Sequence, residues 1–179
     1  TLPGKKCKVV INYIKKNNKK FFKNYLDELK YYLEKSEDGY DNSINEEEPD
    51  YLIIEDFNTT GLIGNLDKPQ NGESYKHFFL TFSKSKQGKK LGRRGQGRNV
   101  YWIASKIRAF FGYSIQHDTK QKLLRGISHA GTLRINDDPY NPYLSFTEQY
   151  DENKPDLQNK KETKPITNKK ILDEFKELV

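Results

Sequence analysis

Short apolar runs and one helical stripe organise the first half of the chain. Residues 8–14 and 51–54 are apolar and rich in valine and isoleucine, which is typical of β-strands. Between them, apolar residues over 21–33 recur at spacings of three and four and predict an amphipathic helix. The acidic, polar stretch 36–50 predicts an exposed loop.

The second half begins with two further helical patterns. Aromatic residues over 75–82 predict a short helix, and apolar spacing over 100–111 predicts another that begins near Gly97. Residues 113–117 and 122–127 flank a polar turn and predict a β-hairpin. We therefore expect an α/β fold, with helices over one face of a mixed, largely antiparallel sheet in a two-layer sandwich.

The character of the sequence changes after a further predicted strand at 132–135. Residues 139–165 combine prolines with many charges and predict a linker. A last amphipathic helix follows, capped by Thr167 or Asn168. Because that helix has no evident place in the first unit, we expect one domain over 1–138 and the start of a further helical domain over 139–179.

Composition narrows the class of protein. The chain has 179 residues, a formal net charge of +7 and a pI near 9.2, which suits a polyanionic partner. It contains no apolar run near the ~20 residues of a membrane helix, so no membrane partner is expected. A single cysteine, Cys7, excludes a disulfide scaffold and indicates a reducing, cytoplasmic location.

The first candidate site is an acid followed by a glycine-bearing loop. Asp56 comes directly after the apolar strand, and Asn58, Gly61 and Gly64 follow it. A carboxylate at a strand end accepts a hydrogen bond from an exocyclic amine such as that of adenine, and glycines let backbone approach a ligand. The alternative is a surface turn with an Asx cap.

The second candidate site is a basic, glycine-rich segment before the predicted helix at 100–111. Glycines at such a position expose N–H groups to an anion, and arginines add charge-assisted donors. The segment comprises Gly92, Arg93, Arg94, Gly95, Gln96, Gly97 and Arg98. It does not match the P-loop, because no Lys-Ser or Lys-Thr pair follows the last glycine. The alternative is a flexible basic loop.

The order of these segments resembles the Bergerat-fold ATPases, the GHKL superfamily that includes histidine kinase-like ATPase domains. Residues 5–136 also resemble an uncharacterised bacterial branch with an EDFNTTGLxG…SKS…GRxGxG pattern. The resemblance implies ATP or ADP and Mg²⁺ as ligands, with Asp56 as the acid that recognises adenine by accepting a hydrogen bond from its amino group. It further implies nucleotide contacts from Asn58, Gly61, Gly64 and Thr132, a lid over Ser83, Lys84, Ser85 and Lys86, and a phosphate loop of Gly92, Arg94, Gly95, Gln96, Gly97 and Arg98.

The chain departs from that family at several positions. Asn58 stands where a glycine is usual, and Arg98 stands where many relatives have lysine. The family's first motif, a helix with a water-activating acid and a magnesium-binding Asn, is absent before the first strand, and we expect it upstream of Thr1. Asn24 and Glu28 are interpreted as surface residues. This chain alone lacks a catalytic base and is therefore expected to bind nucleotide weakly, if at all, and to hydrolyse nothing. The longer protein would be an ATPase whose nucleotide drives a conformational switch.

Other interpretations remain open. The segment 84–98 is strongly basic, so the alternative function is DNA or RNA binding without a nucleotide pocket. The resemblance also admits a homodimer closed by nucleotide-bound lids, and further domains of the same protein as partners. The three histidines lie far apart in sequence, and no metal site is expected from them.

Overall fold

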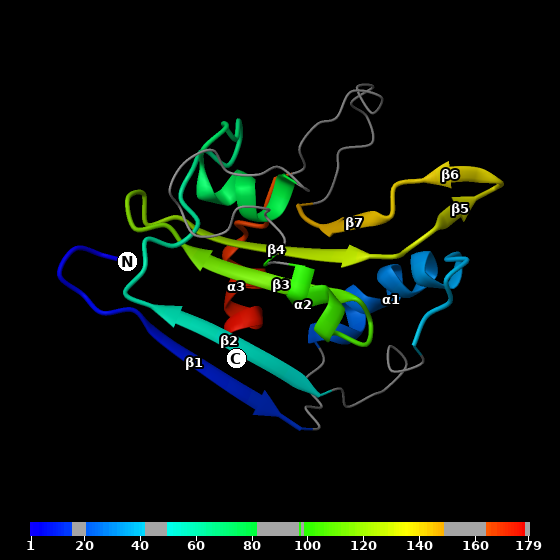
Figure 1. Cartoon of the computed structure of the whole chain (residues 1–179), viewed down its shortest axis with the longest axis horizontal. Helices are drawn as coiled ribbons and strands as arrows, with labels where there is room; N and C mark the ends of the chain where they lie inside the picture. The colour runs from blue at the N-terminus through cyan, green and yellow to red at the C-terminus, as the bar shows by residue number, and fades with distance from the viewer. Residues whose placement is uncertain (16–20, 42–49, 82–96, 98, 149–163, 178–179) are drawn as a thin grey trace.

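A computed structural model shows a mixed α/β protein with small antiparallel sheets and short helices (Figure 1). It describes residues 1–15, 21–41, 50–81, 97, 99–148 and 164–177. The elements are β1 (Lys8–Ile14), α1 (Phe21–Glu34), β2 (Tyr51–Phe57), the π-helix η2 (Lys76–Leu80), α2 (Asn99–Ala104), β3 (Ala109–Ile115), β4 (Lys122–His129), β5 (Leu133–Ile135), β6 (Asp138–Tyr140), β7 (Tyr143–Phe146) and α3 (Lys169–Lys176).

The strands form three antiparallel sheets. The central sheet has the order β3-β4-β7, β1 pairs with β2, and β5 pairs with β6. Tyr51 at the start of β2 packs against the same buried cluster as Phe111 and Tyr113 of β3, and the β1–β2 ribbon lies beside the central sheet (Figure 1). Side chains alternate along each strand, so the β1–β2 ribbon and the central sheet each have two faces for packing.

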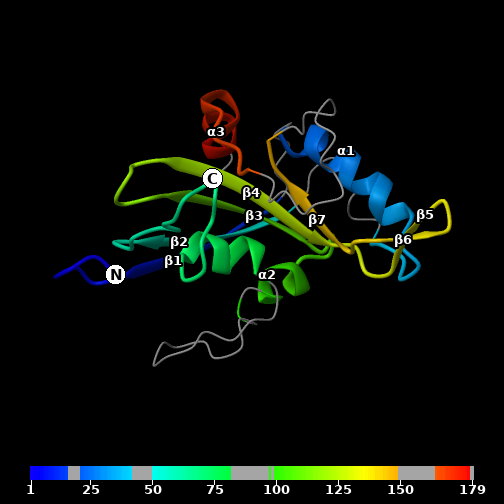
Figure 2. The same ribbon diagram turned by 90° about the horizontal axis from the view of Figure 1, so that it is seen from above.

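Helices cover both faces of the central sheet, whereas the sequence pattern led us to expect them over one face (Figure 2). On the face of α3, Leu124 packs with Leu172 and Phe175. On the face of η2 and α2, Leu123 and Ile127 pack with an aromatic cluster. That cluster contains Tyr75, Phe79 and Trp102. The β4 strand is buried on both sides because its apolar residues are consecutive rather than strictly alternating.

Most predicted elements are confirmed, with one helix boundary wrong. The strands at 8–14 and 51–54, the helix at 21–33 and the hairpin are present, and the hairpin strands are longer than expected. The helix predicted over 100–111 ends at Ala104. Arg108 then adopts a left-handed φ of 51°, and Ala109 begins β3. Phe110 and Phe111 gain more from burial on opposite faces of β3 than from continuing a helix.

The segment after residue 138 packs on the same core, which corrects the linker and helix predictions. Within 139–148, β7 pairs with β4, so this part is sheet rather than linker. The last helix is α3, capped by Asn168, whose side chain accepts hydrogen bonds from two backbone N–H groups. It lies on the central sheet through Leu172 and Phe175. Packing therefore continues across the expected boundary at 138.

Replacing Phe175 by Ala tests whether α3 belongs to the main core. Phe175 is 6% exposed and contacts the rings of Phe111 and Tyr113, so its truncation should lower the free energy of unfolding by about 3 kcal/mol. The measurement is urea denaturation followed by far-UV circular dichroism. Glu174→Ala, exposed on the same helix, is the control and should change stability by less than about 0.5 kcal/mol. Equal effects of both variants would contradict this packing.

Candidate functional site

Asp56 lies on the β2 face that points away from α3. Tyr51 of the same strand packs toward α3, and the alternation of side chains places Asp56 on the opposite face, the side of η2 and α2 (Figure 2). Its side chain is exposed and has no hydrogen bond or ion pair to any residue in the described part of the chain. A carboxylate in this state has its full capacity to accept hydrogen bonds from a ligand.

The loop after β2 contains residues whose backbone adopts the left-handed conformation. Asn58 has a left-handed φ of 62°, and its side-chain amide donates to the carbonyl of Lys6 at 3.0 Å. Gly61 has a φ of +66°, and a Cβ built there would lie 2.1 Å from the carbonyl oxygen of Ile115. Position 61 therefore admits no side chain because its backbone lies against the end of β3, whereas the expected approach of this glycine to a ligand stays a prediction.

Residues at the end of β3 hold this loop in place. The hydroxyl of Ser114 accepts from the N–H of Leu62 at 2.8 Å, and the N–H of His117 donates to the carbonyl of Thr60 at 3.0 Å. The buried Gln116 amide donates to the carbonyls of Leu62 and Gly64 at 3.0 and 2.9 Å. The loop is thus bound on the same side of the sheet as Asp56.

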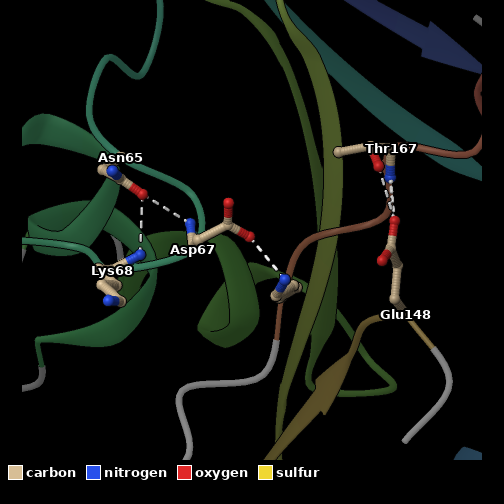
Figure 3. Close-up of polar contacts among 6 residues, drawn as sticks. Asn65, Asp67, Lys68, Glu148 and Thr167 are labelled. Atoms are coloured by element: carbon tan, nitrogen blue, oxygen red, sulfur yellow. Dashed lines mark hydrogen bonds and ion pairs between the residues drawn. The ribbon is translucent and has the colours of Figure 1, made fainter.

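A cavity of about 640 Å³ opens beyond Gly64. The loop after β2, the β3–β4 turn and the segment before α3 all line it. Two polar contacts at its wall join distant segments (Figure 3). Asp67 pairs with Lys164 at 2.6 Å, and Glu148 accepts from both the N–H and the hydroxyl of Thr167 at 2.9 and 2.7 Å. The hydrogen bond from Lys164 to Asp67 raises the pKa of the lysine, although both groups are exposed and the pair adds little stability.

Five exposed apolar side chains share the Asp56 face of the β1–β2 ribbon. We name them the ribbon apolar face: Val9, Ile11, Tyr13, Leu52 and Ile54, each between 44% and 66% exposed. The antiparallel register pairs Ile11 with Ile54 and Tyr13 with Leu52, so they form one patch. On α2, Val100 and Ile103 are also exposed, at 61% and 74%. This side of the molecule therefore carries much uncovered apolar surface.

The structure does not bring Thr132 to Asp56. Thr132 lies between β4 and β5, where its N–H donates to a carboxyl oxygen of Asp38 at 3.1 Å and its carbonyl accepts from the N–H of Glu37 at 2.9 Å. Figure 1 shows β5 and the end of β2 at opposite ends of the molecule. A shallow hollow of about 410 Å³ near Thr132 is therefore separate from the Asp56 loop.

Most of the predicted phosphate loop and lid lies outside the described residues. Of the segment before α2, only Gly97 is described, at a turn two residues before the helix. The residues that lie outside are Ser83, Lys84, Ser85, Lys86, Gly92, Arg94, Gly95, Gln96 and Arg98. Their proposed contacts with phosphate stay predictions.

The described residues contain no group of three or more His, Cys, Asp or Glu side chains that could hold a metal ion. Their histidines have other surroundings. His129, for example, stacks on Trp102 with ring centroids 6.0 Å apart. Glu28 is exposed on α1, as expected for a surface residue.

No helix in the described ranges is long and apolar enough to cross a membrane.

Sequence reasoning missed Ser114 and Gln116 as supports of the loop. Alternation along β3 places both on the η2 side with Phe110, and their burial, which marks them as bound to the loop, is visible only in the structure. Comparison of the chain with protein-family models, with characterised proteins and with solved structures finds no match.

Gly61→Ala tests whether the loop needs close backbone approach. We expect the free energy of unfolding to fall by more than about 2 kcal/mol, because the new Cβ collides with the Ile115 carbonyl. Gly39→Ala is the matched control, since Gly39 has a φ of +69° but nothing within 4 Å of its Cβ position. It should cost only about 1 kcal/mol, the penalty for left-handed backbone. Urea denaturation of both variants measures the difference, and equal losses would contradict the collision.

Proposed function

We propose that this chain is the nucleotide-binding part of a Bergerat-type ATPase that binds ATP or ADP through Asp56 and the loop after it. The observation that carries the proposal is the exposed Asp56 carboxylate, which has no partner among the described residues and precedes a loop held by hydrogen bonds from Ser114 and Gln116. The amino group of adenine would donate a hydrogen bond to this carboxylate. Gly61 allows this loop to pack directly against the end of β3, since a side chain at position 61 would meet the Ile115 carbonyl.

The ribbon apolar face supports a second part of the proposal. An amphipathic helix upstream of Thr1 would cover this patch and stand beside α2 on the Asp56 side of the sheet. The N–H of Leu2 donates to the carbonyl of Asn58 at 2.8 Å, so the start of the chain already lies at the Asp56 loop. Such a helix would supply the catalytic acid and the Asn ligand of Mg²⁺. The nucleotide would then drive a conformational switch in the longer protein.

Asp56→Ala tests the proposed adenine contact. ADP affinity, measured by isothermal titration calorimetry with Mg²⁺, should fall by about tenfold to a hundredfold, the effect of losing a hydrogen bond to a charged group. Stability should change little, because the carboxylate is exposed.

Asp67→Ala is the matched control for that variant. Asp67 is an exposed acid on the same connection, and its partner is the exposed Lys164. Removing it changes the net charge equally and should leave ADP affinity within about twofold. Equal loss in both variants would show a general charge effect. Absence of ADP binding by the unmodified chain, together with binding of DNA or RNA that weakens steeply with salt, would favour the alternative nucleic-acid function.

This chain and a longer one should differ in their ability to hydrolyse ATP. Phosphate release measured with Mg²⁺ and ATP should stay at background for residues 1–179, because neither candidate loop supplies a base for water. A chain extended upstream to include the expected helix should release phosphate and bind ADP more tightly. Turnover by residues 1–179 alone would overturn the assignment of the catalytic acid to an upstream helix.

A further inference from the structure

Gln116 is a fully buried polar side chain at the end of β3. Its exposed fraction is 0%, and its backbone is fixed by the turn that follows, with its N–H donating to the carbonyl of Gln121 at 2.9 Å. Burial of an amide in such a place costs free energy unless every polar atom has a partner. The hydrogen-bond partners of Gln116 therefore indicate its structural role.

The hydrogen bonds of Gln116 match a primary amide and no other side chain of its size. Two N–H donors meet two carbonyls, those of Leu62 and Gly64, at 3.0 and 2.9 Å. The amide oxygen accepts from the hydroxyl of Thr119 at 2.6 Å. Glutamate has the same shape, but its carboxylate only accepts, so it would face two carbonyl oxygens with no proton to share.

The two carbonyls held by Gln116 belong to the loop that follows Asp56. Leu62 comes directly after Gly61 and Gly64 lies two residues further on, and the N–H of Leu62 is fixed by Ser114. Loss of the amide would free both carbonyls and let the loop turn away from the Ile115 carbonyl, which Gly61 approaches so closely. The conformation beside Asp56 thus depends on a residue that is not itself at the ligand.

We propose that Gln116 is the positioning residue of the nucleotide site: it sets the conformation of residues 60–64 and through them the preference for adenine. This inference rests on the proposed function. Gln116 contacts the loop, not the nucleotide, so its effect falls on base recognition. Phosphate binding should be much less sensitive to it.

Gln116→Glu tests the proposal, with Gln121→Glu as the matched control in the same turn. Gln121 is exposed and forms hydrogen bonds through its backbone N–H and carbonyl, so the control adds the same charge without touching the loop. Calorimetry with ADP and with GDP gives the affinity and the preference between the bases. Hydrogen exchange of residues 60–64 without nucleotide reports the loop itself. Thr119→Val, which removes the exposed hydroxyl donor to Gln116, is a milder variant if Gln116→Glu does not fold.

In Gln116→Glu we expect ADP affinity to fall by about tenfold, with the ADP-over-GDP preference reduced and faster exchange in the loop. Gln121→Glu should behave as the unmodified chain, and Thr119→Val should shift in the same direction by less. A folded Gln116→Glu that keeps its ADP preference, while Asp56→Ala loses binding, would overturn the role of Gln116 alone. Failure of both the unmodified chain and a chain extended upstream to bind ADP would overturn the proposed function and this inference with it.

Discussion

The packing of the β3–β4 hairpin between two apolar clusters is the interaction on which the rest of the structure depends. On one face, Leu123 and Ile127 meet η2 and α2, and on the other, Leu124 meets α3. Because a single pair of strands is marginal alone, burial on both faces supplies most of what holds it. The loop after β2 gains its fixed shape by attachment to the end of this hairpin, through Ser114 and Gln116.

Local sequence pattern predicted the elements whose apolar residues follow one period. The strands at 8–14 and 51–54 and the helix at 21–33 each have a simple repeat, and each is present. The sequence pattern gave wrong predictions where pairing with a distant strand determined the secondary structure. Phe110 and Phe111 fit a helical spacing, yet pairing with β4 places them in a strand. Likewise, prolines and charges over 139–165 concealed β7, because a short strand at a sheet edge needs few apolar residues.

The candidate site was predictable in part. Asp56 and Gly61 could be proposed from the sequence because an acid after an apolar strand and a glycine in a tight loop each have a direct physical reason, and their ligand contacts stay predictions. The position of Thr132 depended on how distant strands pair, and it lies with Asp38 rather than Asp56. Gln116 was missed because a buried amide has no sequence pattern of its own. Its partners are backbone carbonyls more than 50 residues away, visible only after folding.

The single tryptophan gives the protein an optical reporter of its own. Trp102 is 7% exposed, its ring stacks on His129, and it sits on the short α2 helix just after Gly97. Indole emission shifts to longer wavelength as water reaches the ring, and a protonated imidazole in contact quenches it. Any rearrangement of α2 against the sheet would therefore change the intrinsic fluorescence of the native chain, with no label attached.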